Sequence, residues 1–199
     1  MLIRPSGLLL VAIALCGPGM PRTAAAQERD AALFRVQIWG DVSAEFGERI
    51  RAYEALRADL ERGLPPREVT TDVGAILDRT RALAKRIREA RSRAQAGDIF
   101  TTDAQGAFRK ALLAELDAAA CAAAMDENPG SLSLPINGGY PTHKPLSTVP
   151  PNVLATLPRL PEDVEYRFAG DQLFLFDTRA AVVIDRMPSA VACRTKNKT

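Results

Sequence analysis

The sequence predicts an α+β domain in which three amphipathic helices pack with a small C-terminal antiparallel β-meander. Apolar residues recur at helical spacing over residues 45–127, and a proline-rich connector follows over 128–161. Short runs of β-branched and aromatic residues, separated by turns, then fill residues 162–187. We therefore expect one domain over 45–193, followed by a tail at 194–199.

The N-terminal 26 residues have the pattern of a secretory signal peptide. Arg4 precedes an apolar run, Gly7 to Cys16, that is too short to span a bilayer comfortably. The small residues of 23–26 suit a signal peptidase, which predicts cleavage before Gln27 and export, to the periplasm. The alternative is an uncleaved anchor. No later segment is apolar enough to cross a membrane, and residues 27–44 fit neither helical nor strand periodicity.

The charge balance excludes one class of partner. Removing residues 1–26 removes Arg4 and Arg22 from the 26 basic residues and leaves 24 basic and 24 acidic residues. A general nucleic-acid binder normally carries a strong basic excess, so nucleic acid is not an expected partner.

The three predicted helices differ in their boundary signals. The first begins near Ser43 and ends before Gly63, the second begins near Thr71 and stops at Gly97, and the third covers 103–127. A capping box at 102–105 starts the third helix, and Pro129 terminates it. The core-facing residues expected on them are Phe46, Ile50, Tyr53, Leu56 and Leu60, then Val73, Ile76, Leu83 and Ile87, then Phe108, Leu112, Leu116 and Ala119.

The second helix is strongly basic on the side away from its apolar residues. Such a face is either solvated or binds an anionic envelope surface. The candidate contacts for that surface are Arg79, Lys85, Arg86 and Arg93.

Two cysteines remain after signal cleavage, Cys121 and Cys193, 72 residues apart. In an oxidising compartment they most simply form one disulfide, which contributes on the order of 4 kcal/mol in the chain-entropy account. Cys121 also lies off the apolar stripe of its helix, which favours a bridge over packing. The alternative is two unpaired cysteines.

The sequence of the meander predicts how its first two strands pair. Gly170-Asp171 suits a two-residue primed turn, which pairs Phe168 with Leu173 and places an apolar face toward the core. The other face carries Phe174, Phe176 and Arg167. It is either covered by helices or is a half-exposed aromatic surface for a partner. The second turn, at Thr178-Arg179, does not fix the register of the third strand.

Few catalytic or metal-binding groups are available. His143 is the only histidine, the two cysteines have no ligand spacing, and no phosphate loop or G-x-S-x-G is present, so we assign no metal, cofactor or catalytic residue. Asp98 is the first carboxylate to consider, with a loop acid before a helix as the simpler interpretation. Tyr140, His143 and Lys144 could line a cleft in the connector, which also contains a candidate short helix at 152–157 after Pro150-Pro151.

Several motifs carry a resemblance. They are the segment 97–100 (GDIF), the run 137–141 with the prolines of 145–150, and the segment 157–168 with Asp177 and Ile184-Asp185. In this order they resemble an uncharacterised family of secreted bacterial proteins over roughly residues 45–191, a family that brings no assigned activity. The meander is also similar to the C-terminal hairpin of periplasmic nickel–cobalt homeostasis proteins, although their Thr-Gly turn is Thr178-Arg179 here and their metal ligands are not present.

The sequence therefore favours a secreted, non-catalytic interaction or structural module with an envelope protein as partner. A carboxylate-based hydrolase and an envelope-surface binder using the basic helix remain the alternatives.

Overall fold

The computed structural model describes residues 24–66, 71–191 and 193, with side chains for residues 39–66, 71–191 and 193. The chain divides into two units, residues 1–36 and 37–199. The described part of the first unit is helical and belongs to α1 (Ala24–Glu61), so the segment 27–44 is part of a helix. Residues 1–23 of the predicted signal peptide and the tail 194–199 lie outside the described residues.

The second half of α1 presents a narrow stripe to the core. Its buried residues recur every three or four positions: Phe46, Ile50, Tyr53 and Arg57. The first three confirm the predicted core face. Leu56 and Leu60 are only partly buried, and Arg57 occupies the core-facing position instead.

Helix α2 (Val73–Ala90) begins at Asp72, whose carboxylate accepts a hydrogen bond from the Ala75 N–H at 3.2 Å. Leu83 and Ile87 are buried as predicted. Val73 and Ile76, which were also predicted to face the core, are 65% and 48% exposed, because the first turns of α2 extend past the elements that cover its second half.

The third predicted helix is two helices, α3 (Thr102–Glu115) and α4 (Ala118–Asp126). The break follows from Asp117, whose side chain accepts from the N–H groups of Ala119 and Ala120 and starts a new helix. The cap of α3 is Thr101, one residue before the predicted capping box. With the predicted short helix α5 (Pro151–Thr156), the described chain has five helices rather than three.

The sheet has three antiparallel strands in the order β1 (Val164–Ala169), β2 (Gln172–Asp177) and β3 (Val182–Met187). The predicted pairing of Phe168 with Leu173 is confirmed. Gly170 holds a φ of 61°, as the first central residue of a primed turn requires. Between β2 and β3 a register shift follows Leu175, which pairs with Asp185 while Phe176 pairs with Val183.

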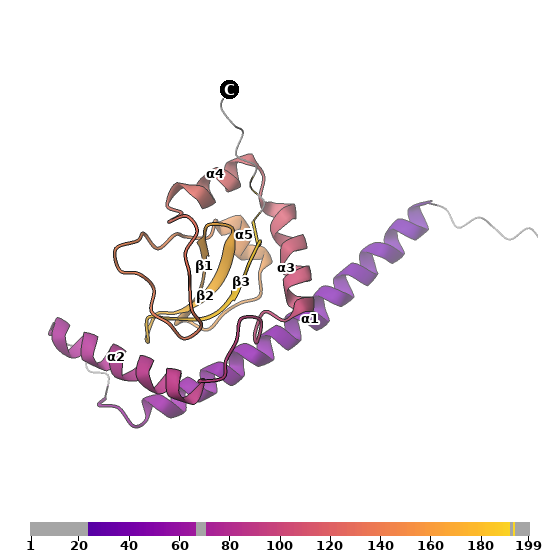
Figure 1. The fold of residues 1–199 in the computed structure, drawn as a ribbon. Helices are drawn as coiled ribbons and strands as arrows, with labels where there is room; N and C mark the ends of the chain where they lie inside the picture. The colour runs from indigo at the N-terminus through magenta and orange to yellow at the C-terminus, as the bar shows by residue number, and fades with distance from the viewer. Residues whose placement is uncertain (1–23, 67–70, 192, 194–199) are drawn as a thin grey trace, which may run out of the picture. The chain divides into compact units, whose positions relative to one another are not determined.

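Each face of the sheet has its own cover. The first face, with Tyr166, Phe168 and Leu175, joins the main core with the helices. The second face, with Phe174 and Phe176, is covered by connector residues of a second cluster: Leu132, Leu134, Tyr140 and Leu146. In Figure 1 the sheet lies between α3 on one side and the loops of the connector on the other.

The connector also pairs with the outer edge of β3. Asn137 donates its backbone N–H to Val183 O at 2.7 Å, and Val183 returns its N–H to Gly138 O at 2.9 Å. Gly139 and Val182 form a further bridge. The β3 edge of the sheet is therefore paired with the connector, and β1 forms the other edge.

Candidate binding groove at the edge of the sheet

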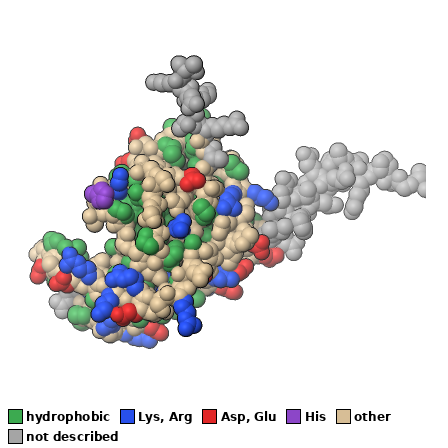
Figure 2. All heavy atoms as spheres, viewed as in Figure 1, with side chains coloured by type: hydrophobic (Ala, Val, Ile, Leu, Met, Phe, Trp, Pro, Cys, Tyr) green, Lys and Arg blue, Asp and Glu red, His purple; other side chains and the backbone are tan. Residues whose placement is uncertain are grey.

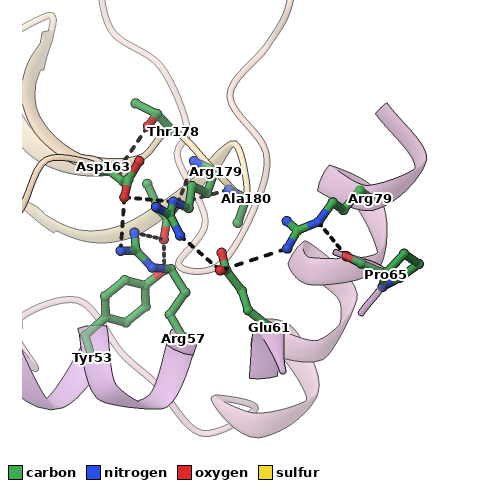
Figure 3. A network of polar contacts seen from close by, with 10 residues as sticks. Tyr53, Arg57, Glu61, Pro65, Arg79, Asp163, Thr178, Arg179 and Ala180 are labelled. Carbon is green, nitrogen blue, oxygen red and sulfur yellow. Dashed lines mark hydrogen bonds and ion pairs between the residues drawn. The ribbon is translucent and has the colours of Figure 1, made fainter. Parts of the chain in front are cut away.

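A buried ionic network joins α1 to the β2–β3 turn (Figure 3). Asp177 is fully buried and accepts from the Tyr53 hydroxyl at 2.6 Å and the Arg57 guanidinium at 3.1 Å. Its second oxygen accepts from the backbone N–H groups of Arg179 and Ala180, which closes the turn. Burial, and next the charge of Asp177, raises the pKa of the Tyr53 hydroxyl, so the phenol stays protonated and remains a donor.

The network continues to α2 with matched charges. Arg179 contacts Asp163 at 2.7 Å and Glu61 at 3.0 Å, and Arg79 lies 4.0 Å from Glu61. Asp163 also faces Arg57 at 3.5 Å. Its six ionic side chains, three of each sign, are Arg57, Arg79, Arg179, Glu61, Asp163 and Asp177. Because each carboxylate faces an arginine, this network links α1, α2 and the β2–β3 turn and offers no free acid or base.

Asp185 organises the segment 97–100. Its buried carboxylate accepts from the N–H groups of Gly97 at 2.8 Å, Ile99 at 2.7 Å and Phe100 at 2.7 Å. Burial raises the pKa of Asp185, and these backbone hydrogen bonds oppose the rise. Two of the sequence motifs, Ile184-Asp185 and the segment 97–100, are thus in contact, and their hydrogen bonds join β3 to the loop before α3.

The side chain of Asp98 takes no part in the hydrogen bonds to Asp185. Its side chain is exposed and accepts from the Gln95 N–H at 2.9 Å, within its own loop. The simpler interpretation of Asp98, a loop acid, therefore describes its position.

A groove of about 420 Å³ lies along β1. It is formed by the end of the connector, α5, the α5–β1 loop and the strand itself. The lining residues are Thr148, Val149, Leu154, Pro158, Arg159, Leu160, Val164, Glu165, Tyr166 and Arg167. This volume and the apolar walls are typical of ligand sites in proteins.

The floor of the groove is an open position of the sheet edge. Alternate residues of an edge strand direct their N–H and C=O groups away from the neighbouring strand. On β1 these are Val164, Tyr166 and Phe168. Ser147 Oγ accepts from the Phe168 N–H and donates to its carbonyl, and Val164 donates to Pro161 O at 3.0 Å. Among the described residues no group pairs with the backbone of Tyr166, which lies between these two positions.

Among the described residues that line the groove, one cation has no partner. Arg167 forms an ion pair with Glu165 and donates to Ser147 O at 3.1 Å, so these charges cancel. The Arg159 side chain is exposed and has no ion pair or hydrogen bond within the described part of the chain. Sequence reasoning identified only Arg167 here. The sequence feature that could have indicated this site is the pair of prolines before β1, Pro158 and Pro161. Proline has no backbone N–H, so this segment cannot continue the pairing of a strand.

The predicted aromatic surface on the other face is not exposed. Phe174 is fully buried and Phe176 nearly so, because the connector covers both rings. Tyr140 stacks on Phe174 with ring centroids 5.8 Å apart, and its hydroxyl donates to Pro145 O. The structure thus corrects both interpretations of this face, since the connector rather than helices covers it and the two rings are not half-exposed.

His143 and Lys144 are exposed in the same loop as Tyr140. Neither of them lines the groove.

The basic residues of α2 are largely engaged within the protein. Arg86 donates to Leu60 O at 2.7 Å and Gly63 O at 2.6 Å, where it satisfies carbonyls at the end of α1. Arg79 donates to Pro65 O, and Lys85 lies 3.9 Å from Glu89. Figure 2 shows acidic side chains among the basic ones over this part of the surface.

The second helix ends at Ala90 rather than at the predicted Gly97, so Arg93 lies beyond α2. Of the four predicted surface contacts, only Arg93 is exposed without an ion pair or hydrogen bond inside the described regions. The structure therefore does not bring Arg79, Lys85, Arg86 and Arg93 together as one free basic surface.

The predicted disulfide between Cys121 and Cys193 is confirmed, with Cα atoms 5.7 Å apart. It ties the end of the described chain to α4. Over residues 24–66, 71–191 and 193, no helix is long and apolar enough to cross a membrane, and no cluster of three or more ligating side chains is suited to a metal ion.

No protein-family model, no curated protein and no solved structure matches this chain. The resemblance to a family of secreted bacterial proteins therefore stays a prediction, and the site is interpreted from its own geometry.

Proposed function

We propose that this protein is a non-catalytic interaction module of the periplasm, which holds an extended segment of an envelope partner in the β1 groove. The observation that supports this best is the open backbone position of Tyr166 at the floor of a groove with apolar walls. A bound peptide can pair with an exposed strand edge through its main chain and place side chains in neighbouring pockets.

The compartment is proposed on two grounds. Residues 1–26 have the signal-peptide pattern, and the Cys121–Cys193 disulfide suits an oxidising environment. The mass of the exported protein tests this part, since cleavage predicts a mature chain that begins at Gln27.

The two alternatives have less geometric support. A carboxylate-based hydrolase needs two carboxyl groups across a cleft, and the groove is lined by a single one, Glu165, which is paired with Arg167. An anionic-surface binder needs free cations on α2, where Arg79 and Arg86 are instead bonded to carbonyls of the chain.

The groove can be tested by site-specific photo-cross-linking in the exporting host. Leu154 lines the groove and is 44% exposed, whereas Leu113 on α3 is 63% exposed and does not line it. If exposure alone decided cross-linking, Leu113 would give more product. We expect a photo-reactive residue at 154, and not at 113, to give a discrete adduct with an envelope protein.

A groove-filling variant makes this test specific. Thr148 is an exposed lining residue, and Thr142 is an exposed threonine of the same connector outside the groove. Thr148→Trp should abolish the adduct at 154, and Thr142→Trp should leave it unchanged. An adduct that survives Thr148→Trp, or no adduct at 154, would overturn the proposed function.

A further inference from the structure

Within the described residues, Tyr166 is the one outward position of β1 with both its N–H and its carbonyl unpaired. Ser147 occupies the outward groups of Phe168, and Pro161 O accepts the outward N–H of Val164. These two positions lie about 13 Å apart along the strand, with Tyr166 between them. A strand that runs through the groove would need both backbone groups of the next pairing position on each side. Phe168 has neither group free, and Val164 offers only its carbonyl, so neither position can form a full pair.

From this geometry we infer that the groove receives the C-terminal end of an extended chain, with an apolar last residue and a free carboxylate. This inference rests on the proposed function and names the ligand class of the same site. The last residue of a bound chain needs only one backbone pairing position, because the chain does not continue beyond it. The unpaired backbone groups of Tyr166 provide such a position.

The charge of the groove fits such an end. The ion pair of Arg167 with Glu165 is neutral, so Arg159 gives the groove a net positive charge. Its guanidinium lacks a partner among the described residues, and an arginine binds a carboxylate through two parallel hydrogen bonds. A C-terminal carboxylate supplies this complementary charge at the end of the chain, where pairing with β1 stops.

The apolar walls fit the last side chain. Leu154 is a large hydrophobic residue that remains 44% exposed, and it lines the groove together with Val149, Pro158 and Leu160. A leucine- or valine-sized side chain would bury this surface, which favours binding.

The test uses two display libraries of random heptapeptides, selected against the full mature protein. One library presents a free C-terminus, and the other is fused to its carrier through the C-terminus. We expect binders from the first library only, ending in an apolar residue. They should shift the NMR signal of the Tyr166 amide and protect it from solvent exchange.

The best peptide is then synthesised as a free acid and as a C-terminal amide. Loss of the charged contact should weaken binding at least about tenfold for the amide. Arg159→Gln should weaken the free acid similarly and remove the difference between the two peptides. Arg93→Gln, which removes another exposed arginine without an ion pair, is the matched control and should change neither affinity.

The outcomes separate this inference from the proposed function. Binders from the second library that still shift the Tyr166 amide would overturn the chain-end specificity and leave the groove as a peptide site. Equal binding of acid and amide would do the same. If neither library yields a peptide that perturbs the Tyr166 amide, both the inference and the proposed function fail.

Discussion

Single buried side chains in this protein connect segments that are distant in the sequence. Asp177 receives donors from α1 and from its own turn, and Asp185 receives three N–H groups of residues 97–100. Both carboxylates are fully buried, and among their partners Tyr53, Arg57, Ile99 and Phe100 are buried as well. Removing either charge therefore lowers the free energy of unfolding mainly because buried donors are left without their acceptor.

Asp177→Asn should lower the free energy of unfolding by about 3–5 kcal/mol, because it leaves the buried Arg57 guanidinium without its closest countercharge. Urea unfolding of the purified protein measures this change. Asp59→Asn breaks an exposed pair with Arg62 and should cost less than about 1 kcal/mol. Equal costs for the two variants would contradict the structural role of the network.

Tyr53 gives the protein an alkaline dependence of stability. Its pKa is raised in the folded state, so above pH 10 the unfolded chain loses this proton while the folded chain keeps it. The contribution of Tyr53 to the free energy of unfolding is therefore fully present below pH 10. Above pH 10 the free energy of unfolding falls by up to about 1.4 kcal/mol per pH unit because of this group.

The variant Tyr53→Phe tests this dependence. It should be less stable at pH 7, by about 1–3 kcal/mol, since Asp177 loses a donor. Between pH 10 and 11 its stability should fall less steeply than that of the wild type. Tyr166, whose pKa is raised by burial, keeps part of the slope in both proteins. Identical slopes would show that Tyr53 titrates normally in the folded state.

At the scale of elements, the turns and caps decide where each helix and strand ends. Asp117 divides the third predicted helix, and Gly170 turns β1 into β2. At Gly170 both conformation and space matter: its φ is 61°, and an added Cβ would lie 3.0 Å from Ser131 Cα. That contact is with connector backbone, which cannot move as freely as a side chain.

Gly170→Ala should therefore destabilise the protein by at least about 1–2 kcal/mol through the left-handed conformation alone. Gly106 lies within α3 with nothing within 4 Å of an added Cβ, so Gly106→Ala should stabilise by about 1 kcal/mol. Chemical denaturation of both variants checks the opposite signs. A neutral or stabilising Gly170→Ala would mean that the turn is not as described, and a destabilising Gly106→Ala would contradict the open space at that position of α3.

At the scale of the domain, the disulfide closes a covalent loop with a sequence separation of 72 residues. Cys121–Cys193 encloses the whole connector and the whole sheet, and Ala190 and Val191 before Cys193 donate two hydrogen bonds to Asp171 O. The bridge thus restricts the unfolded chain over 72 residues.

Reduction should lower the free energy of unfolding by about 4 kcal/mol, and the double variant Cys121→Ser/Cys193→Ser should start at that lower value. Unfolding curves with and without a thiol reductant measure both. The double variant is the control, because reductant should not affect it. A reductant effect of equal size in the double variant would remove the disulfide as the cause.

Local patterns in the sequence determined much of this architecture. The strand runs and Gly170 gave the fold class and the first hairpin register, since side-chain alternation and positive φ are properties of adjacent residues. The core stripes of α1 and α2 followed in part from helical spacing, and the position of Cys121 off its stripe indicated the bridge.

The tertiary structure decided what covers each surface. Phe174 and Phe176 are buried because the connector folds over them, and Arg86 is engaged because α1 ends beside it. The groove exists because Ser147 and Pro161 close the β1 edge on either side of Tyr166. These contacts join residues far apart in the chain, and a residue's sequence neighbours do not specify which distant segment will reach it.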